Sequence, residues 1–343
     1  MFENKGSYGK YTRIWALISC VMMAALLMSG CGQAQESKVY RVGVLSGLDA
    51  FSPAIDGFKA KLTELGYVEG ENIVYDVQKT NVDMDAYTNI TKKFVEDKVD
   101  LIFAFPTEAA MVAKAATQGT NIPVVFTLAF TDVPGVDLIN SVRAPGENIS
   151  GVRFPSADIA SKRLQILLEL APSAKRVFVP YLKDYPNVPG QLAVIRPQAQ
   201  RSGVELVEFA AASPQELQTE LDTFIATDGI GIDAILMIAE PLAITPPFYE
   251  VMGKFAYDHQ IPIGGAPMSI GENYSSIFGL LPDAKVTGEQ AALLTEKIFG
   301  GLVAGTIPVV TADSVFQINY KATQTMGLMV PEGLLKQADE IIR

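Results

Sequence analysis

Short apolar runs, separated by segments that carry apolar residues at helical spacing, recur along the chain from residue 38 onward. In the first half these runs predict strands at 39–45, 73–77, 101–105 and 124–127. In the second half, at similar intervals, they predict strands at 176–181, 203–208, 232–238 and 260–264. Strands that alternate with helices are typical of parallel βαβ units, so the sequence describes one α/β unit twice.

This duplication predicts an α/β protein of two Rossmann-like lobes, each with a parallel sheet, joined by a hinge of several strands. We expect lobe 1 to contain residues 38–152 and about 280–310, and lobe 2 to contain residues 153–279 and about 311–343. The repeat ends after Pro282, where the sequence predicts a helix at 289–299, an extended segment at 309–318 and a last helix at 334–342.

The chain begins with a basic segment, followed by an apolar stretch and then by small residues. Residues 1–13 carry three basic residues, residues 14–27 are almost wholly apolar, and Met28, Ser29 and Gly30 lead to Cys31. This order predicts an export signal over residues 1–30 and a polar tether over residues 31–37. The apolar stretch is shorter than the ~20 residues of a spanning helix. The alternative is an uncleaved N-terminal anchor.

The residues that end at Cys31 also resemble the lipobox of bacterial lipoproteins. The resemblance implies that cleavage leaves Cys31 as a lipidated N-terminus. We therefore expect an exported protein that is lipid-anchored to the bacterial cell envelope, in the periplasm or on the outer face of the membrane.

Charge and composition exclude several classes of function. Without residues 1–30 the chain keeps 24 basic and 37 acidic residues, a net charge of −13, which disfavours nucleic acid as a partner. His259 is the single histidine, and Cys20 and Cys31 are the two cysteines, so His-Cys metal sites and catalytic dyads that need such residues are not expected. The chain also lacks a phosphate-binding glycine motif. We expect no metal, no cofactor and no catalysis.

Ligands of open α/β sheets bind beyond the carboxyl ends of the strands, and this rule selects the candidate site residues. Aromatic rings among them could bury a flat ligand, and carboxylates could hold an amine. Thr107 is the expected N-cap of a helix whose free N–H groups could hold a carboxylate. The set therefore suits a zwitterion with an apolar or aromatic side chain. Its members are Ser46, Phe105, Thr107, Glu108, Phe130, Asp132, Tyr181, Tyr185, Glu240 and Met268.

Six segments, in this order and spacing, are similar to those of the ABC-transporter substrate-binding protein family that includes tryptophan- and tyrosine-type amino-acid binders. They lie at 65–72, 99–102, 121–126, 145–152, 162–164 and 318–323. The resemblance covers nearly all of residues 38–343 and implies the type I periplasmic-binding-protein fold. The chain departs from the family pattern at the expected pocket, at 105–108, 131–134 and 240–241.

The resemblance implies a solute-binding lipoprotein of an ABC importer, which captures a small organic ligand between two lobes and delivers it to an ABC permease in the membrane. We expect the protein to be a monomer. In one alternative the protein binds the same ligand but presents it to a membrane sensor, as a signalling module. Another is a hydrolase that uses the carboxylates of Glu108 and Glu240.

Overall fold

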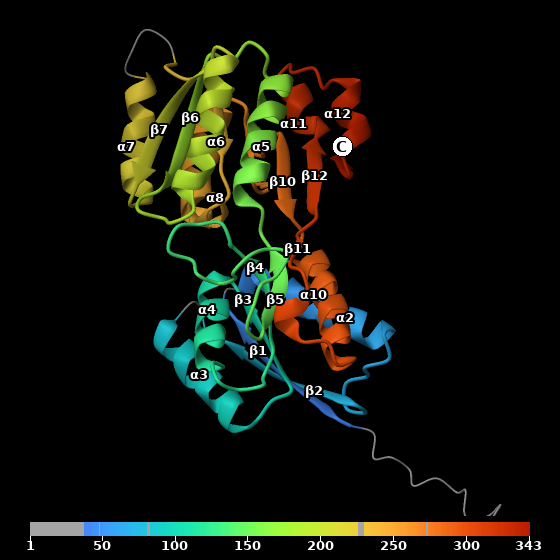
Figure 1. The fold of residues 1–343 in the computed structure, drawn as a ribbon. Coiled ribbons are helices and arrows are strands. Elements are labelled where there is room, and N and C mark those ends of the chain that lie inside the picture. Colours follow the sequence, from blue (N-terminus) through green and yellow to red (C-terminus); the bar gives the residue numbers. More distant parts are fainter. Residues whose placement is uncertain (1–37, 48, 81–82, 226–229, 272–273) are drawn as a thin grey trace, which may run out of the picture. The chain divides into compact units, whose positions relative to one another are not determined.

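The computed structural model describes residues 38–47, 49–80, 83–225, 230–271 and 274–343 (Figure 1). The predicted signal at 1–30, the lipidation residue Cys31 and the tether at 31–37 lie outside the described residues. Residues 40–343 form one compact unit. Among the described residues, no helix has the length and hydropathy that crossing a membrane requires.

The first sheet has six strands in the order β11-β5-β4-β3-β1-β2, and all its neighbouring pairs are parallel. Its strands are β1 (Tyr40–Ser46), β2 (Ile73–Lys79), β3 (Leu101–Phe105), β4 (Val124–Ala129), β5 (Ile149–Arg153) and β11 (Val310–Thr311). The helices around it are η1 (Asp49–Phe51), α2 (Pro53–Glu64), α3 (Met84–Glu96), α4 (Thr107–Ala116), α10 (Ala284–Phe299) and η2 (Ala304–Thr306).

The second sheet has seven strands in the order β13-β12-β10-β9-β8-β6-β7, in which only the β10–β12 pair is antiparallel. Its strands are β6 (Arg176–Leu182), β7 (Glu205–Ala211), β8 (Ala234–Met237), β9 (Ile263–Gly265), β10 (Phe278–Pro282), β12 (Ser314–Asn319) and β13 (Glu340–Ile342). Its helices are α5 (Ser156–Leu170), α6 (Val188–Arg201), α7 (Pro214–Ile225), α8 (Pro241–Ile244), α9 (Pro246–Asp258), α11 (Tyr320–Thr325) and α12 (Glu332–Gln337).

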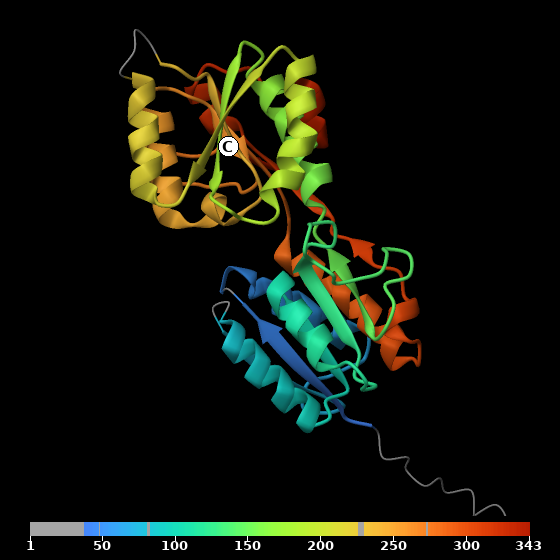
Figure 2. The ribbon, with the colours of Figure 1, turned by 60° about the vertical axis from the view of Figure 1, so that its left-hand side comes forward.

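The two sheets repeat one strand order, which confirms the α/β fold class predicted from the sequence. The order β2-β1-β3-β4-β5 in the first sheet corresponds to β7-β6-β8-β9-β10 in the second. Helices cover both faces of each sheet, as the turned view shows for the second one, with α5 and α6 on one side and α7 and α9 on the other (Figure 2). The central strands β3, β4 and β8 are fully buried between these layers, as continuous apolar runs require.

The chain passes between the two sheets three times. It leaves the first sheet after β5, returns between β10 and α10, and leaves again between β11 and β12. The short connecting segments are residues 154–155, 283 and 312–313. We call each sheet, together with the helices around it, one half of the structure. Segments far apart in the sequence belong to the same half, as the packing of α10 on α2 shows (Figure 1).

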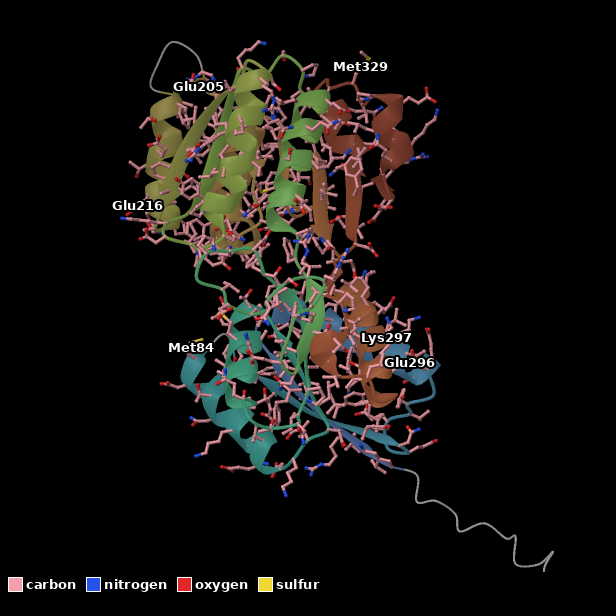
Figure 3. The ribbon with its side chains drawn as sticks, viewed as in Figure 1. Met84, Glu205, Glu216, Glu296, Lys297 and Met329 are labelled. Atoms are coloured by element: carbon pink, nitrogen blue, oxygen red, sulfur yellow. The ribbon has the colours of Figure 1, made fainter. Side chains whose placement is uncertain are left out.

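Side-chain caps define the starts of two helices, α3 and α10, and Figure 3 draws the side chains with Met84 labelled. Met84, labelled in that view, is the first residue of α3, and the preceding Asp83 caps the helix by accepting a hydrogen bond from Ala86 N at 2.9 Å. Asp283 does the same for α10 through Val286 N, so this helix begins five residues before the predicted start at 289.

The predicted last helix at 334–342 is confirmed only for its first part, and its second part is wrong. Helix α12 ends at Gln337, and Glu340–Ile342 forms strand β13, which pairs in parallel with β12. Asp339, just before β13, is hydrogen-bonded to Phe316 of β12. Its N–H donates to Phe316 O and its carboxylate accepts from Phe316 N, both at 2.8 Å. The predicted extended segment at 309–318 is likewise divided between β11 and β12, which belong to different sheets.

Helices α2 and α10 approach so closely that glycine is required on both. A Cβ atom at Gly57 would lie 2.0 Å from Lys285 O, and one at Gly288 would lie 2.0 Å from Ala54 O. Both obstacles are backbone atoms of the facing helix, which cannot move aside as a flexible side chain can. This contact joins the C-terminal part of the chain to the first half.

We predict that Gly288→Ala destabilises the protein by about 1–3 kcal/mol, because the added methyl group forces the two helices apart. The free energy of unfolding, from urea titration, measures the effect. Gly190→Ala in α6 is the matched control, since its Cβ would meet nothing within 4 Å and should be neutral or slightly stabilising. Equal stability of the two variants would contradict the close contact.

Candidate functional site

A cavity of about 210 Å³ lies beyond the carboxyl ends of strands from both sheets. Its lining residues follow β1, β3, β4 and β5 in the first sheet and β6, β8, β9 and β10 in the second, or form the ends of these strands. They are Phe51, Pro106, Thr107, Glu108, Leu128, Phe130, Phe154, Tyr185, Ala239, Glu240, Pro241, Ile244, Ala266 and Leu281. This is where the topology of an open α/β sheet places a ligand.

Most of the cavity wall is apolar, and aromatic rings make up much of it. The rings of Phe130 and Phe154 meet edge to face with 5.5 Å between their centroids. Leu128, which also lines the cavity, has a positive φ of 50° and lies within a bulge between β4 and β5. A wall of this kind suits the flat apolar body of a small molecule.

Glu240 places a buried carboxylate in this apolar wall. The residue is 6% exposed, and its Oε2 accepts hydrogen bonds from Leu182 N at 3.2 Å and Leu242 N at 3.0 Å. Its Oε1 is buried and has no hydrogen-bond partner. Burial raises the pKa of Glu240 from 4.5 to about 7, against the opposing effect of the N–H groups of Leu242, Leu182 and Ala243.

Two further polar side chains face the same cavity. Glu108 is the second residue of α4, and Tyr185 follows β6. Burial raises the pKa of the Tyr185 phenol, and the charges of Glu108 and Glu240 raise it further. The phenol therefore stays protonated between two carboxylates, as a hydrogen-bond donor in the wall.

Among the described residues that line the cavity there is no lysine, arginine or histidine. Arg153 precedes the lining residue Phe154, but its guanidinium is held elsewhere, 3.9 Å from Asp132 and 3.4 Å from Asp158. Its Nε donates to Thr311 Oγ1 at 3.0 Å. The described residues also contain no group of three His, Cys, Asp or Glu side chains that could hold a metal ion.

Two buried amide side chains hold the loop that carries Glu240. Gln191 donates to Ala239 O and accepts from Ala239 N, both at 2.9 Å, and Asn187 donates to Ala239 O at 2.7 Å. Both residues lie at the start of α6 and are almost fully buried. Sequence reasoning missed them, because no local pattern marks a side chain that binds a backbone 48 or 52 residues away.

A second cavity of about 310 Å³ adjoins the first and shares four lining residues with it, Thr107, Glu108, Phe130 and Tyr185. Its other lining residues are Met111, Val133, Pro134, Gly135, Val136, Pro186 and Asn187. No basic side chain is among these described lining residues either. Glu108 and Tyr185 therefore line both cavities.

The structure brings five of the ten predicted site residues together at the first cavity, namely Thr107, Glu108, Phe130, Tyr185 and Glu240. Thr107 is there in a different role from the one predicted. It is the first residue of α4 and not its N-cap, which is Pro106, and its Oγ1 accepts a hydrogen bond from Phe130 N at 3.1 Å. This bond ties the loop after β4 to the start of α4.

The other five predicted residues do not line either cavity. Ser46 and Phe105 end their strands with buried side chains, and the Phe105 ring packs 5.0 Å from that of Phe103. Asp132 pairs with Arg153. The remaining two are Tyr181, which lies within β6, and Met268, which packs against Gly279. Position in the chain located the correct edge of each sheet, but side-chain direction decided which residues reach the cavity.

Several apolar residues of the cavity were missed by sequence reasoning, namely Phe51, Leu128, Phe154, Ile244, Ala266 and Leu281. Phe51, Leu128 and Ala266 lie in loops that the strand-end rule selects, at 46–51, 128–132 and 266–269, but they are not among the ten predicted residues. An apolar side chain at a strand end gives no signal that separates a cavity wall from an ordinary core.

We predict that the protein without ligand loses stability as pH rises from about 4.5 to about 7, because the folded state binds the Glu240 proton more tightly than the unfolded state does. The contribution of this group is on the order of 3 kcal/mol and is constant above pH 7. Glu240→Gln should remove it. Urea unfolding of both proteins at a series of pH values measures the difference, and parallel stability profiles would contradict the raised pKa.

Comparison with known proteins relates the chain to one family. The family model for "ABC transporter substrate binding protein" matches residues 41–342. A curated tyrosine-binding protein of Clostridioides difficile (strain R20291) is 28% identical over 322 residues, which are 89% of each chain.

Solved structures share the fold. A Streptococcus pneumonia ABC domain in complex with L-Trp superposes with a TM-score of 0.74 at 20% identity, over 89% of this chain and 100% of that one. A ligand-free, open substrate-binding protein with adhesive properties, from Clostridium difficile, gives a TM-score of 0.70 at 25% identity, over 89% and 99% of the two chains. The periplasmic-binding-protein type of fold is thus confirmed for this chain.

Proposed function

The chain belongs to the family of ABC transporter substrate-binding proteins, and we propose that it captures a small ligand with an aromatic or apolar body and an ammonium group. Aromatic amino acids are of this class. The single observation that carries the proposal is the Glu240 carboxylate, which is buried with an unpaired Oε1 in a residue that lines a cavity walled by apolar and aromatic side chains.

The family consists of solute-binding proteins and not of enzymes, which sets the hydrolase alternative aside and supports a binding role for Glu108 and Glu240. An ammonium group carries three N–H donors and a positive charge, which match two carboxylates and their free oxygen lone pairs. An apolar ligand body would displace water from the rings of Phe51, Phe130 and Phe154. The named relatives that bind tyrosine and L-Trp support this ligand class.

In the cell, the protein would deliver its ligand to an ABC permease as part of an importer. Substrate-binding proteins of ABC transporters work outside the cytoplasmic membrane, which agrees with an export signal at 1–30 and a lipid anchor on Cys31. The cavity is lined from both halves of the chain, and three short segments join these halves. Ligand binding would favour a closed arrangement that the permease recognises.

We predict that aromatic compounds with an ammonium group raise the melting temperature of the full chain in mild detergent, since binding to the folded state alone stabilises it. Glu240→Gln should weaken their binding by a factor of at least about ten, because the charge-assisted hydrogen bonds are lost. Calorimetric titration measures the affinity. Glu71→Gln, at an exposed turn, is the control with the same change of atoms and should bind normally. Unchanged affinity in Glu240→Gln would refute the proposal.

Ligand affinity should also depend on pH. The ammonium group binds the ionised form of Glu240, whose pKa without ligand is about 7. Affinity is therefore expected to rise with pH up to about 7, to level off above it, and to fall by up to about tenfold per pH unit below it. Titrations between pH 5 and pH 8.5 test this, and the dependence should be absent in Glu240→Gln. A flat profile in the unaltered protein would contradict a role for this carboxylate.

A further inference from the structure

We propose that the cavity prefers aromatic amines that lack a carboxylate over the free amino acids with the same side chain. The inference rests on the proposed function and narrows it, since both compounds belong to the same ligand class. It follows from the distribution of charge around the two adjoining cavities.

The cavities present negative charge and no positive side chain. Glu240 and Glu108 line the first cavity, and Glu108 also lines the second. Within the part of the chain that the structure describes, neither lining contains lysine, arginine or histidine. A zwitterion brings both an ammonium group and a carboxylate into this space. Only the ammonium group finds an opposite charge there.

Three basic residues lie close in sequence to residues that line the cavities, but their side chains have other partners or are exposed. Arg153, next to the lining residue Phe154, interacts with Asp132, Asp158 and Thr311. Lys183, two residues before Tyr185, is exposed and does not line the cavity. Lys114 of α4 donates to Asp137 O at 3.0 Å and lies 3.7 Å from Glu147. A ligand carboxylate would therefore have no cationic partner in the cavity wall.

Helix α4 does not replace that missing cation. The N–H groups of its first turn could bind an anion. However, Glu108 is the second residue of this helix, so a ligand carboxylate held there would lie close to the carboxylate of Glu108. Repulsion between like charges is strong where apolar side chains exclude water. The negative charge of Glu108 already occupies the favourable position at the helix start.

The ammonium group of a ligand, in contrast, interacts favourably with each polar side chain in the wall. The unpaired Oε1 of Glu240 and the carboxylate of Glu108 attract it, and the phenol oxygen of Tyr185 can accept one of its hydrogen bonds. A monocation keeps this attraction in full. In a zwitterion the repulsion of its carboxylate offsets part of the same attraction.

Two matched ligand pairs test the inference on the full chain in mild detergent at pH 8. Phenethylamine differs from phenylalanine, and tyramine from tyrosine, only by the carboxylate. We expect calorimetric titration to give each amine a dissociation constant at least tenfold below that of its amino acid. Hydrocinnamate, which has the carboxylate without the amine, should not bind.

Substitutions then separate the two carboxylates. Glu108→Gln should reduce the ratio between the dissociation constants of the amino acid and the amine, because it removes the charge nearest to the ligand carboxylate. Glu240→Gln should weaken both ligands by similar factors, and Glu71→Gln should change neither. Amino acids that bind as tightly as the amines, or more tightly, would overturn this inference and leave the proposed function intact. If neither class binds, both the inference and the proposed function fail.

Discussion

Parallel pairing in a single strand order, used twice, is the constraint on which the rest of this structure depends. In the order β2-β1-β3-β4-β5, and again in β7-β6-β8-β9-β10, every strand ends at the same edge of its sheet. The loops that follow β3 and β8 therefore reach one cavity, although Glu108 and Glu240 lie 132 positions apart in the sequence. The cavity needs no motif of its own, because backbone hydrogen bonding in the sheets already places its wall.

Glu240 shows the energetic cost of placing a functional group in that wall. Burial favours the neutral form of its carboxyl group, and only Oε2 is satisfied, through the N–H groups of Leu182 and Leu242. The loop keeps its position because Gln191 binds both the N–H and the C=O of Ala239, and Asn187 binds the same C=O. An unsatisfied oxygen held by a rigid support is the arrangement that a ligand cation can complete.

The C-terminal part of the chain completes both halves and does not form a separate domain. Helix α10 packs on α2 through two glycines, and β11 adds to the first sheet. Strands β12 and β13 extend the second sheet beyond β10, where the internal repeat has ended. In the order of the described elements, the chain links the two halves through the short connections at 154–155, 283 and 312–313.

The sequence by itself determined the scaffold. Apolar runs of strand length, spaced by helices, specify parallel sheets because both faces of such strands must be buried, and this gave the α/β class, the duplication and the edge of each sheet where ligands bind. It did not determine the end of the chain, where a segment with helical spacing became β13 because the edge of β12 offered backbone partners. The sequence also predicted Ser46 and Phe105 as site residues on the same grounds as Glu108, although Ser46 and Phe105 are buried in the core.

Only the tertiary structure decided which side chains meet. The burial that shifts the pKa of Glu240, the support from Asn187 and Gln191, and the engagement of Arg153 by two aspartates all arise from residues distant in sequence. Local pattern carries the period of a strand or helix, but the charge balance of a cavity depends on side-chain direction and long-range packing, which no local pattern records.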